Sequence, residues 1–312
     1  MNSVPCNFIS SVVAFMSVQN WNFDALETLN SILWSRISKL QAGKVVRFES
    51  RLLFDVDTDS WRVVFYNSRQ QTFNFDELTT FSRDIVFFEE VSIGYLEDDD
   101  DKTDAEHFRE VNSETINKIL PYIAAQQKID FFLLDLPDHH LNDTILWKFV
   151  DCDFSGIEIN IDAPLYIAYR VLERQLKRKT LETMHFHNSC STKEVQKALL
   201  CLLLQPQIKQ ISCNNALPLK FFETFIKRWL QSDGKGFDFH LQFLPKFAPS
   251  KLKSLLKCIP KDSDGGNAYA KKHPKSDKCL VIRDLSTDCH MEFLNFHAVN
   301  DSWKRKLTTD KE

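Results

Sequence analysis

Three residues in the middle of the chain have the side-chain types of a transition-metal site. His185 and His187 alternate along a stretch with a strand pattern, so both imidazoles project from one face, and Cys190 follows three residues later. A tetrahedral site also needs a fourth ligand or a water, and the chain has no HExxH helix or paired CxxC knuckle. We interpret these residues as structural or solvated, and we predict no metal and no cofactor.

Other sequence motifs give no support for catalysis. The chain contains no GxSxG elbow, no P-loop and no dinucleotide fingerprint, and it has only seven glycines. Its 39 basic and 43 acidic side chains give a net charge of -4, which provides no general attraction to nucleic acid or to an anionic membrane. The basic clusters at 177–179 and 271–278 lack interleaved aromatic residues and are interpreted as solvated helix ends and loops. We predict a non-catalytic protein.

An apolar pattern repeats through the second half of the chain. Its first positions are 129, 154, 181 and 208, which are 25, 27 and 27 residues apart, and helix patterns fill the later gaps at 164–176, 193–204 and 217–230. The repeated positions are Ile129, Phe132 and Leu134; Phe154, Ile157 and Ile159; Leu181, Met184 and Phe186; Ile208, Ile211 and Cys213; and, in a weaker fifth copy, Phe237, Phe239 and Leu241. A strand-helix unit of this size cannot bury its own apolar face, so the copies must stack on one another.

The repeat predicts an α/β fold in which parallel strands form one curved sheet with helices on the other side, as in a leucine-rich-repeat-like solenoid. The region 261–278 has the composition of a loop, and strand patterns at 279–283 and 290–296 are expected to cap the last repeat.

The first half of the chain is predicted to be helical and then β-rich. Helix patterns cover 4–40, strand patterns cover 44–56, 61–66 and 84–96, and the polar break at 57–60 predicts a hairpin. Five acidic residues at 97–101 mark a solvated boundary, and a helix is expected at 110–125. The predicted divisions are a helical segment at 1–40, a small β-rich region at 41–96, an acidic linker at 97–109, a repeat domain at 110–260, and a loop with capping strands at 261–312.

The cysteines indicate a reducing compartment. Eight cysteines are scattered without a CxxC pair, and several fall on apolar faces of the predicted elements. The amino terminus does not have the pattern of a secretory signal, and the longest apolar run, at 198–204, is too short to span a bilayer. We predict a cytoplasmic or nuclear protein.

Polar residues between the core positions of the strands are candidates for a partner-binding surface. Cross-strand alignment predicts one column with Leu133, Glu158, His185 and Ser212, and a second with Asp135, Asn160, His187 and Asn214. The candidate surface residues are the polar members Glu158, Asn160, His185, His187, Ser212 and Asn214. On an open sheet face these columns would form a mixed polar surface that suits protein recognition. The alternative is that they are solvated sheet residues with no partner.

The amino-terminal apolar pattern resembles a degenerate F-box, a short helical module that opens with Leu-Pro and ends near a Trp. It begins with Val4-Pro5, continues through Phe8-Ile9 and Val12-Val13, and ends at Leu33-Trp34. The alternative is a plain helical hairpin that packs against the repeats.

The whole chain resembles a large nematode-expanded family of F-box-related proteins. The resemblance rests on Asn2-Ser3-Val4-Pro5, Phe8, Val12-Val13, Leu33-Trp34, Leu172-Glu173-Arg174-Gln175-Leu176, Leu181-Glu182, Pro206-Gln207-Ile208-Lys209-Gln210-Ile211 and Phe221-Phe222-Glu223. It implies a substrate-recruiting subunit whose amino-terminal helices dock on the small adaptor of a cullin-based ubiquitin ligase, while the repeats hold an unknown protein target. The implied docking residues are Pro5, Phe8, Ile9, Val12, Val13 and Trp34. The alternative function is a non-catalytic repeat scaffold without ligase docking.

Overall fold

The structure is a computed structural model of a mixed α/β protein. It describes residues 45–96, 107–126, 128–136, 139–160, 166–186, 192–234, 236–259, 267–285, 288–299 and 301–308. The described residues up to 136, together with Trp147–Phe154, form a first compact unit. The residues 139–146 and those from 155 onward form a second.

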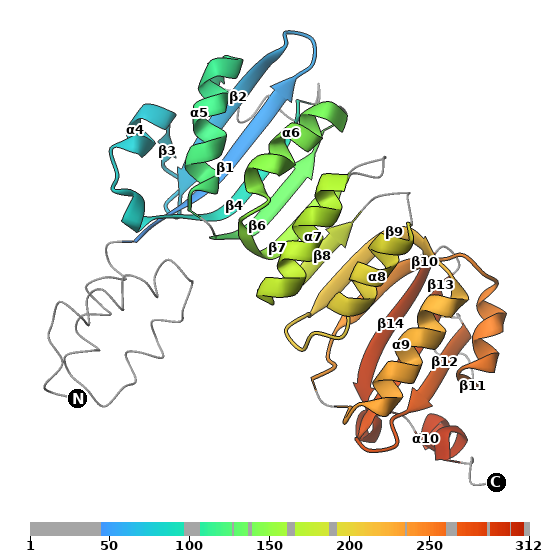
Figure 1. The fold of residues 1–312 in the computed structure, drawn as a ribbon. Coiled ribbons are helices and arrows are strands. Elements are labelled where there is room, and N and C mark those ends of the chain that lie inside the picture. The colour runs from blue at the N-terminus through green and yellow to red at the C-terminus, as the bar shows by residue number, and fades with distance from the viewer. Residues whose placement is uncertain are drawn as a thin grey trace, which may run out of the picture. The chain divides into compact units, whose positions relative to one another are not determined.

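The first unit contains a twisted sheet that begins with a hairpin (Figure 1). Its strands are β1 (Val46–Asp55), β2 (Ser60–Asn67), β3 (Thr72–Phe73), β4 (Val86–Tyr95), β5 (Arg109–Val111) and β6 (Lys128–Asp135). β1 pairs antiparallel with β2, and β4 pairs in parallel with both β1 and β6. At the hairpin turn the Asp55 carboxylate accepts hydrogen bonds from the backbone N–H groups of Asp57 and Thr58. The three predicted strands and the hairpin are confirmed.

Two helices and a 3-10 turn cover one face of this sheet: α4 (Phe75–Thr79), the turn η1 (Arg83–Ile85) and α5 (Ser113–Ala124). A cluster of phenylalanines fills the space between the sheet and this layer. Asn112 begins α5 by accepting a hydrogen bond from the Thr115 N–H at 2.9 Å. The ring of Phe48 packs edge-on against Phe73 and Phe81. The helix expected at 110–125 is confirmed, except that its first residues pair with β2 as strand β5.

The second unit has parallel strands followed by antiparallel strands. In spatial order the strands are β7 (Asp153–Asn160), β8 (Thr183–Phe186), β9 (Gln210–Leu217), β10 (His240–Pro245), β14 (Asp288–Asn295), β13 (Lys278–Leu285), β12 (Asn267–Lys272) and β11 (Lys257–Ile259). The order is linear, so this sheet is open. β7, β8, β9 and β10 run parallel to one another, and the remaining four alternate in direction.

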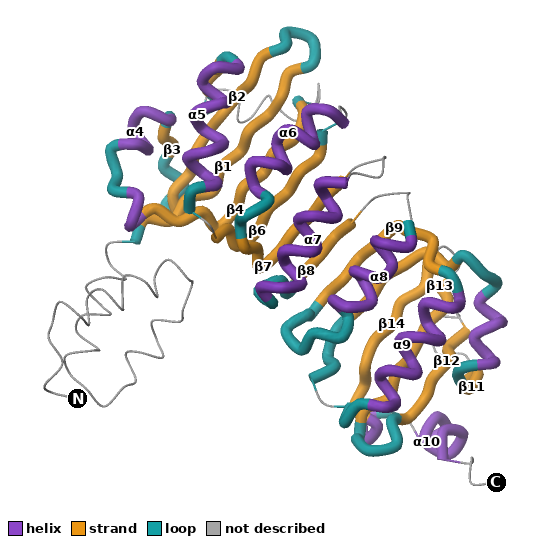
Figure 2. The backbone as a smooth tube through the Cα atoms, in the orientation of Figure 1, coloured by secondary structure: helices purple, strands orange, loops and turns teal. Residues whose placement is uncertain are grey.

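Four helices belong to the parallel part: α6 (His139–Phe149), α7 (Tyr166–Arg178), α8 (Lys193–Leu202) and α9 (Leu219–Gln231). The last three match the predicted segments, whereas α6 fills the first gap of the repeat, where no helix was predicted. In Figure 2, α7, α8 and α9 all lie on the same face of the strands of the second unit. α8 begins where the Thr192 hydroxyl accepts a hydrogen bond from the Val195 N–H at 3.2 Å.

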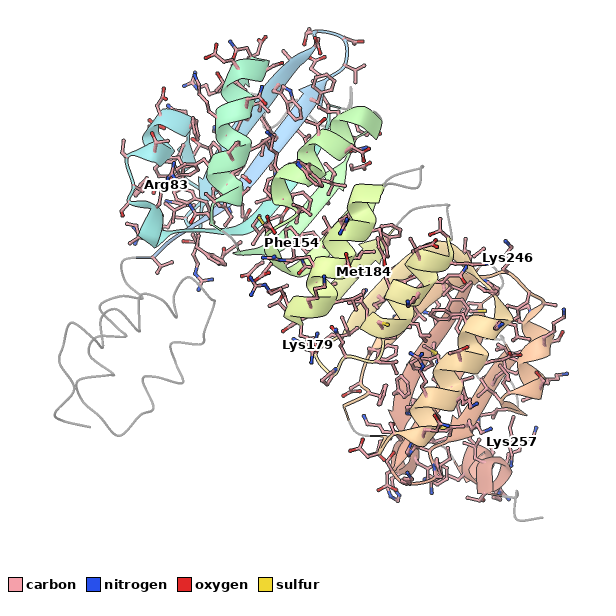
Figure 3. The ribbon with its side chains drawn as sticks, viewed as in Figure 1. Arg83, Phe154, Lys179, Met184, Lys246 and Lys257 are labelled. Atoms are coloured by element: carbon pink, nitrogen blue, oxygen red, sulfur yellow. The ribbon has the colours of Figure 1, made fainter. Side chains whose placement is uncertain are left out.

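The repeated apolar residues form the core on that helix-covered face. Met184, which Figure 3 labels on β8, pairs with Ile157 and Ile211, and all three side chains are fully buried. The fifth copy of the repeat was predicted two residues too early. Leu241 and Phe243 are the residues that pair with Ile211 and Cys213. Phe237 and Phe239 are buried as well, but they precede β10 and pack against Phe225 and Phe293.

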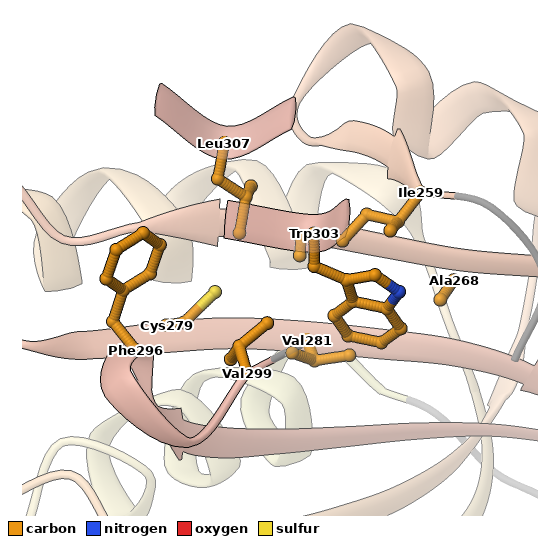
Figure 4. Packing of buried hydrophobic residues seen from close by; sticks show 9 residues of the cluster. Ile259, Ala268, Cys279, Val281, Phe296, Val299, Trp303 and Leu307 are labelled. Carbon is orange, nitrogen blue, oxygen red and sulfur yellow. The ribbon is translucent and has the colours of Figure 1, made fainter. Parts of the chain in front are cut away.

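The C-terminal strands carry a second core on the opposite face. Alternate residues of β12 and β13 there pack against the 3-10 turn η3 (Phe296–Ala298) and helix α10 (Asp301–Thr308) (Figure 4). The buried cluster contains Ile259, Ala268, Ala270, Cys279, Val281, Phe296, Val299, Trp303 and Leu307. The predicted strands at 279–283 and 290–296 are confirmed as β13 and β14.

The prediction of a loop throughout 261–278 was wrong for residues 267–272. These residues form strand β12, which hydrogen-bonds to β11 and β13 and fully buries Ala270. His273 after it is also buried. Its Nε2 lies 3.0 Å from the Trp229 carbonyl oxygen, and its Nδ1 accepts the Lys275 N–H at 3.1 Å. Tertiary pairing therefore overrides the polar composition of this stretch.

None of the described helices is both long enough and apolar enough to cross a membrane.

Candidate partner-binding face

Only some of the predicted site residues lie among the residues that the structure describes. The six predicted adaptor-docking residues and two of the three metal-type residues lie outside the described residues. They are Pro5, Phe8, Ile9, Val12, Val13, Trp34, His187 and Cys190. Asn160 ends β7, and Asn214 lies in β9 at the point where the pairing of β9 with β10 shifts register.

The first predicted column lies on the sheet face opposite α7, α8 and α9. His185 in β8 pairs with Glu158 in β7 and with Ser212 in β9. Each of these residues alternates with buried core residues, so its side chain projects to the other side of the sheet. Glu158 and His185 are half-buried, and Ser212 is only 7% exposed because its neighbours cover it.

The same row continues across three further strands, through residues that were not predicted as part of the partner-binding surface. Gln242 in β10 pairs with Ser212, His290 in β14 pairs with Gln242, and Arg283 in β13 pairs with His290. Six polar side chains on six adjacent strands therefore form one row. We call this set of residues the polar row: Glu158, His185, Ser212, Gln242, His290 and Arg283.

Contacts between side chains fix the C-terminal half of the polar row. His240 and Glu292 pair with each other two residues along the strands from Gln242 and His290, and they reach diagonally into the row. His240 Nε2 lies 3.0 Å from His290 Nδ1, so the N–H of one imidazole donates a hydrogen bond to the bare ring nitrogen of the other. The Arg283 guanidinium lies 2.8 Å from a Glu292 carboxylate oxygen, and each of these side chains is 28% exposed.

The centre of the row is linked more loosely. The Ser212 hydroxyl lies 3.5 Å from the Gln242 amide oxygen, which is the outer limit of a hydrogen bond. Hydroxyl and amide groups can each donate and accept hydrogen bonds, so both can exchange this contact for one with another molecule. The row thus presents a carboxylate, two imidazoles, a hydroxyl, an amide and a guanidinium, the groups that recognise polar protein surfaces.

The described residues contain no cluster of three or more His, Cys, Asp or Glu side chains that could hold a metal ion. The described cysteines are free thiols, and burial raises the pKa of the Cys279 thiol to about 12, which keeps it protonated and unreactive at neutral pH.

The prediction from sequence missed half of the polar row for identifiable reasons. Gln242 was hidden by the misplaced fifth repeat, and His290 and Arg283 lie on antiparallel strands that do not follow the repeat interval. A signal was present in the Cys289-His290-Met291 alternation, which places His290 opposite two buried neighbours.

A comparison of the chain with models of protein families, with curated proteins and with solved structures finds no match in any of the three.

Proposed function

We propose that this chain is a protein–protein interaction protein that holds a target protein on the face of its second unit that lies opposite α7, α8 and α9. The observation that carries the proposal is the polar row, whose six members are cross-strand neighbours on adjacent strands. With about 4.8 Å between neighbouring strands, the five steps of the row span about 24 Å. That length exceeds most small-molecule ligands and suits a segment of a partner protein.

The chemistry of the row supports recognition of a polar surface. Strand backbones fix its side chains, the His240 and His290 imidazoles touch, and Arg283 contacts Glu292. A partner that meets groups already held in place loses less conformational entropy on binding than one that must order flexible chains. Glu158 at one end of the row and the Arg283–Glu292 ion pair at the other differ in charge, which favours one orientation of a partner with complementary groups.

The second part of the proposal concerns the amino terminus. On the resemblance to F-box-related proteins, the segment with Pro5, Phe8, Ile9, Val12, Val13 and Trp34 docks on the adaptor of a cullin-based ubiquitin ligase. The strand-helix repeats, taken as a leucine-rich-repeat-like solenoid, then place the bound target near the ligase. The chain itself performs no chemistry in this role.

The adaptor interaction is tested by pulldown of the purified full-length chain with the ligase adaptor subunit. Wild type is expected to bind, and a Pro5→Ala/Ile9→Ala variant with an unchanged circular-dichroism spectrum is expected not to bind. A folded wild type that fails to bind the adaptor would sink the ligase assignment. It would leave a non-catalytic repeat scaffold.

The target interaction is tested separately by cross-linking and mass spectrometry in cells. A variant of the row, Glu158→Lys/Gln242→Ala/His290→Ala, is expected to lose partners that wild type captures. A control triple variant on exposed helix positions, Lys193→Glu/Lys197→Ala/Lys220→Ala, is expected to retain them. Identical partner sets for wild type and the row variant would contradict recognition through the polar row.

A further inference from the structure

A pocket of about 730 Å³ lies at the C-terminal end of the second unit, away from the polar row. It opens between the 3-10 turn η2 (Pro249–Ser254), the start of β11, the end of β12 and the last turn of α10. Among the ten described residues that line it, five are lysines and none is an aspartate or a glutamate. The lysines are Lys253, Lys257, Lys271, Lys272 and Lys306.

Backbone carbonyls hold two of these ammonium groups in place. Lys257, labelled in Figure 3, donates from Nζ to the Lys306 carbonyl oxygen at 2.9 Å, and Lys271 donates from Nζ to the Leu255 carbonyl oxygen at 3.3 Å. An ammonium group has three N–H donors, so the contact of Lys271 leaves donors for another acceptor. A third ammonium, that of Lys272, lies 4.2 Å from the centre of the Phe296 ring.

The charge at this pocket is local and is not explained by the composition of the chain. The whole sequence has a net charge of -4, yet five positive side chains gather around one opening. The cluster includes Lys271 and Lys272, which the sequence reading placed in a solvated loop. The structure places both on β12, where they are half-buried. Their mutual repulsion is strongest within about 10 Å, the screening length at moderate salt, and a bound anion relieves it.

We propose that this pocket binds a compact ligand with several phosphate groups. Its volume falls within the range of about 300–1,000 Å³ that is usual for small-molecule sites. Lysine binds phosphate as a point charge, and ammonium groups from four separate elements suit several anionic groups on one small scaffold. An extended acidic peptide would instead need basic groups along a continuous groove, whereas these lysines line a single pocket.

Calorimetric titration of the full-length chain with inositol hexakisphosphate tests the proposal. Wild type is expected to bind, and Lys253→Gln/Lys271→Gln/Lys272→Gln is expected to weaken binding roughly 10- to 100-fold through the loss of three screened attractions. The matched control Lys193→Gln/Lys197→Gln/Lys220→Gln removes the same charge from exposed positions of α8 and α9. It is expected to keep the affinity within about twofold, because distant exposed charges are screened.

A further variant and two further ligands complete the test. If the pocket triple variant melts early, Lys253→Glu replaces it, because Lys253 is exposed on η2, and its affinity is expected to fall severalfold. Absence of binding by folded wild type, or equal weakening by the two triple variants, would overturn the proposal. Inorganic phosphate and hexaglutamate are expected to bind more weakly than inositol hexakisphosphate. Hexaglutamate binding as tightly would refute the assignment to a phosphate ligand.

Discussion

Replacement of Trp303 tests whether α10 stabilises the C-terminal end of the second unit. Its indole is 4% exposed and is the largest side chain of the cluster that joins α10 to β12 and β13. Truncation of a buried Trp to Ala typically costs about 3–5 kcal/mol, since it removes buried apolar surface and leaves a cavity. α10 has eight residues, too few to be stable alone, so the lost contacts are expected to release the whole helix.

Two measurements on Trp303→Ala report this loss. Urea unfolding followed by circular dichroism is expected to show a lower free energy of unfolding, by an amount near that range. Labelling of the native protein with a thiol reagent is expected to reach Cys279 faster, because this residue is fully buried in the same cluster. Trp147→Ala is the matched control. Its indole is 57% exposed on α6, and its loss is expected to cost less than about 0.5 kcal/mol.

The result that would refute this reasoning is equality of the two variants. If Trp303→Ala and Trp147→Ala unfold at the same urea concentration, and Cys279 stays protected in both, then α10 does not contribute the packing free energy argued for it.

Two further predictions concern proton binding and backbone strain. Burial raises the pKa of the Cys279 thiol from 9.0 to about 12, so the folded state keeps its proton at higher pH than the unfolded chain does. This stabilisation is complete below about pH 9 and is lost as the pH rises to about 12. Over that pH range the free energy of unfolding of wild type should therefore fall by up to about 4 kcal/mol more than that of Cys279→Ala. Parallel stability profiles from urea unfolding would contradict it. Gly234 has a φ of +72°, and a Cβ there would lie 2.3 Å from the Ser276 Oγ atom. Gly234→Ala is therefore expected to lower stability by about 1–3 kcal/mol, while Gly94→Ala, with its nearest atom at 3.6 Å, changes it by less than about 0.5 kcal/mol. Equal melting-temperature shifts would show that strain at Gly234 is absent.

The strands of the parallel part could be predicted because burial on one face imposes a period of two. Met184 and Ile211 recur at the repeat interval, and both are fully buried and paired. The same rule failed at β10 because Phe237 and Phe239 are equally apolar. They are buried by Phe225 and Phe293 before the strand begins, so hydrophobicity alone could not separate the strand from the segment that leads into it.

Elements whose formation depends on residues distant in sequence could not be predicted from local sequence patterns. β12 has few large apolar residues, and its existence depends on hydrogen bonds to β11 and β13. The lysine pocket has the same origin. Lys253, Lys272 and Lys306 are separated by up to 53 residues in sequence, and only the folding of η2, β12 and α10 around one opening brings them together. The local sequence pattern around each lysine does not indicate that the side chains meet at one pocket.

Core and open side chains alternate along the same strands, and this alternation links stability to recognition in the second unit. His185 lies between Met184 and Phe186, and Ser212 lies between Ile211 and Cys213, so each polar residue is flanked by two buried ones. The helices that bury these neighbours restrain the backbone from which the polar side chain projects. A partner bound at the polar row, as we propose, would therefore contact groups on rigid strands. Such a partner would not require a loop to close over it, because the core on the helix-covered face already fixes the positions of these side chains.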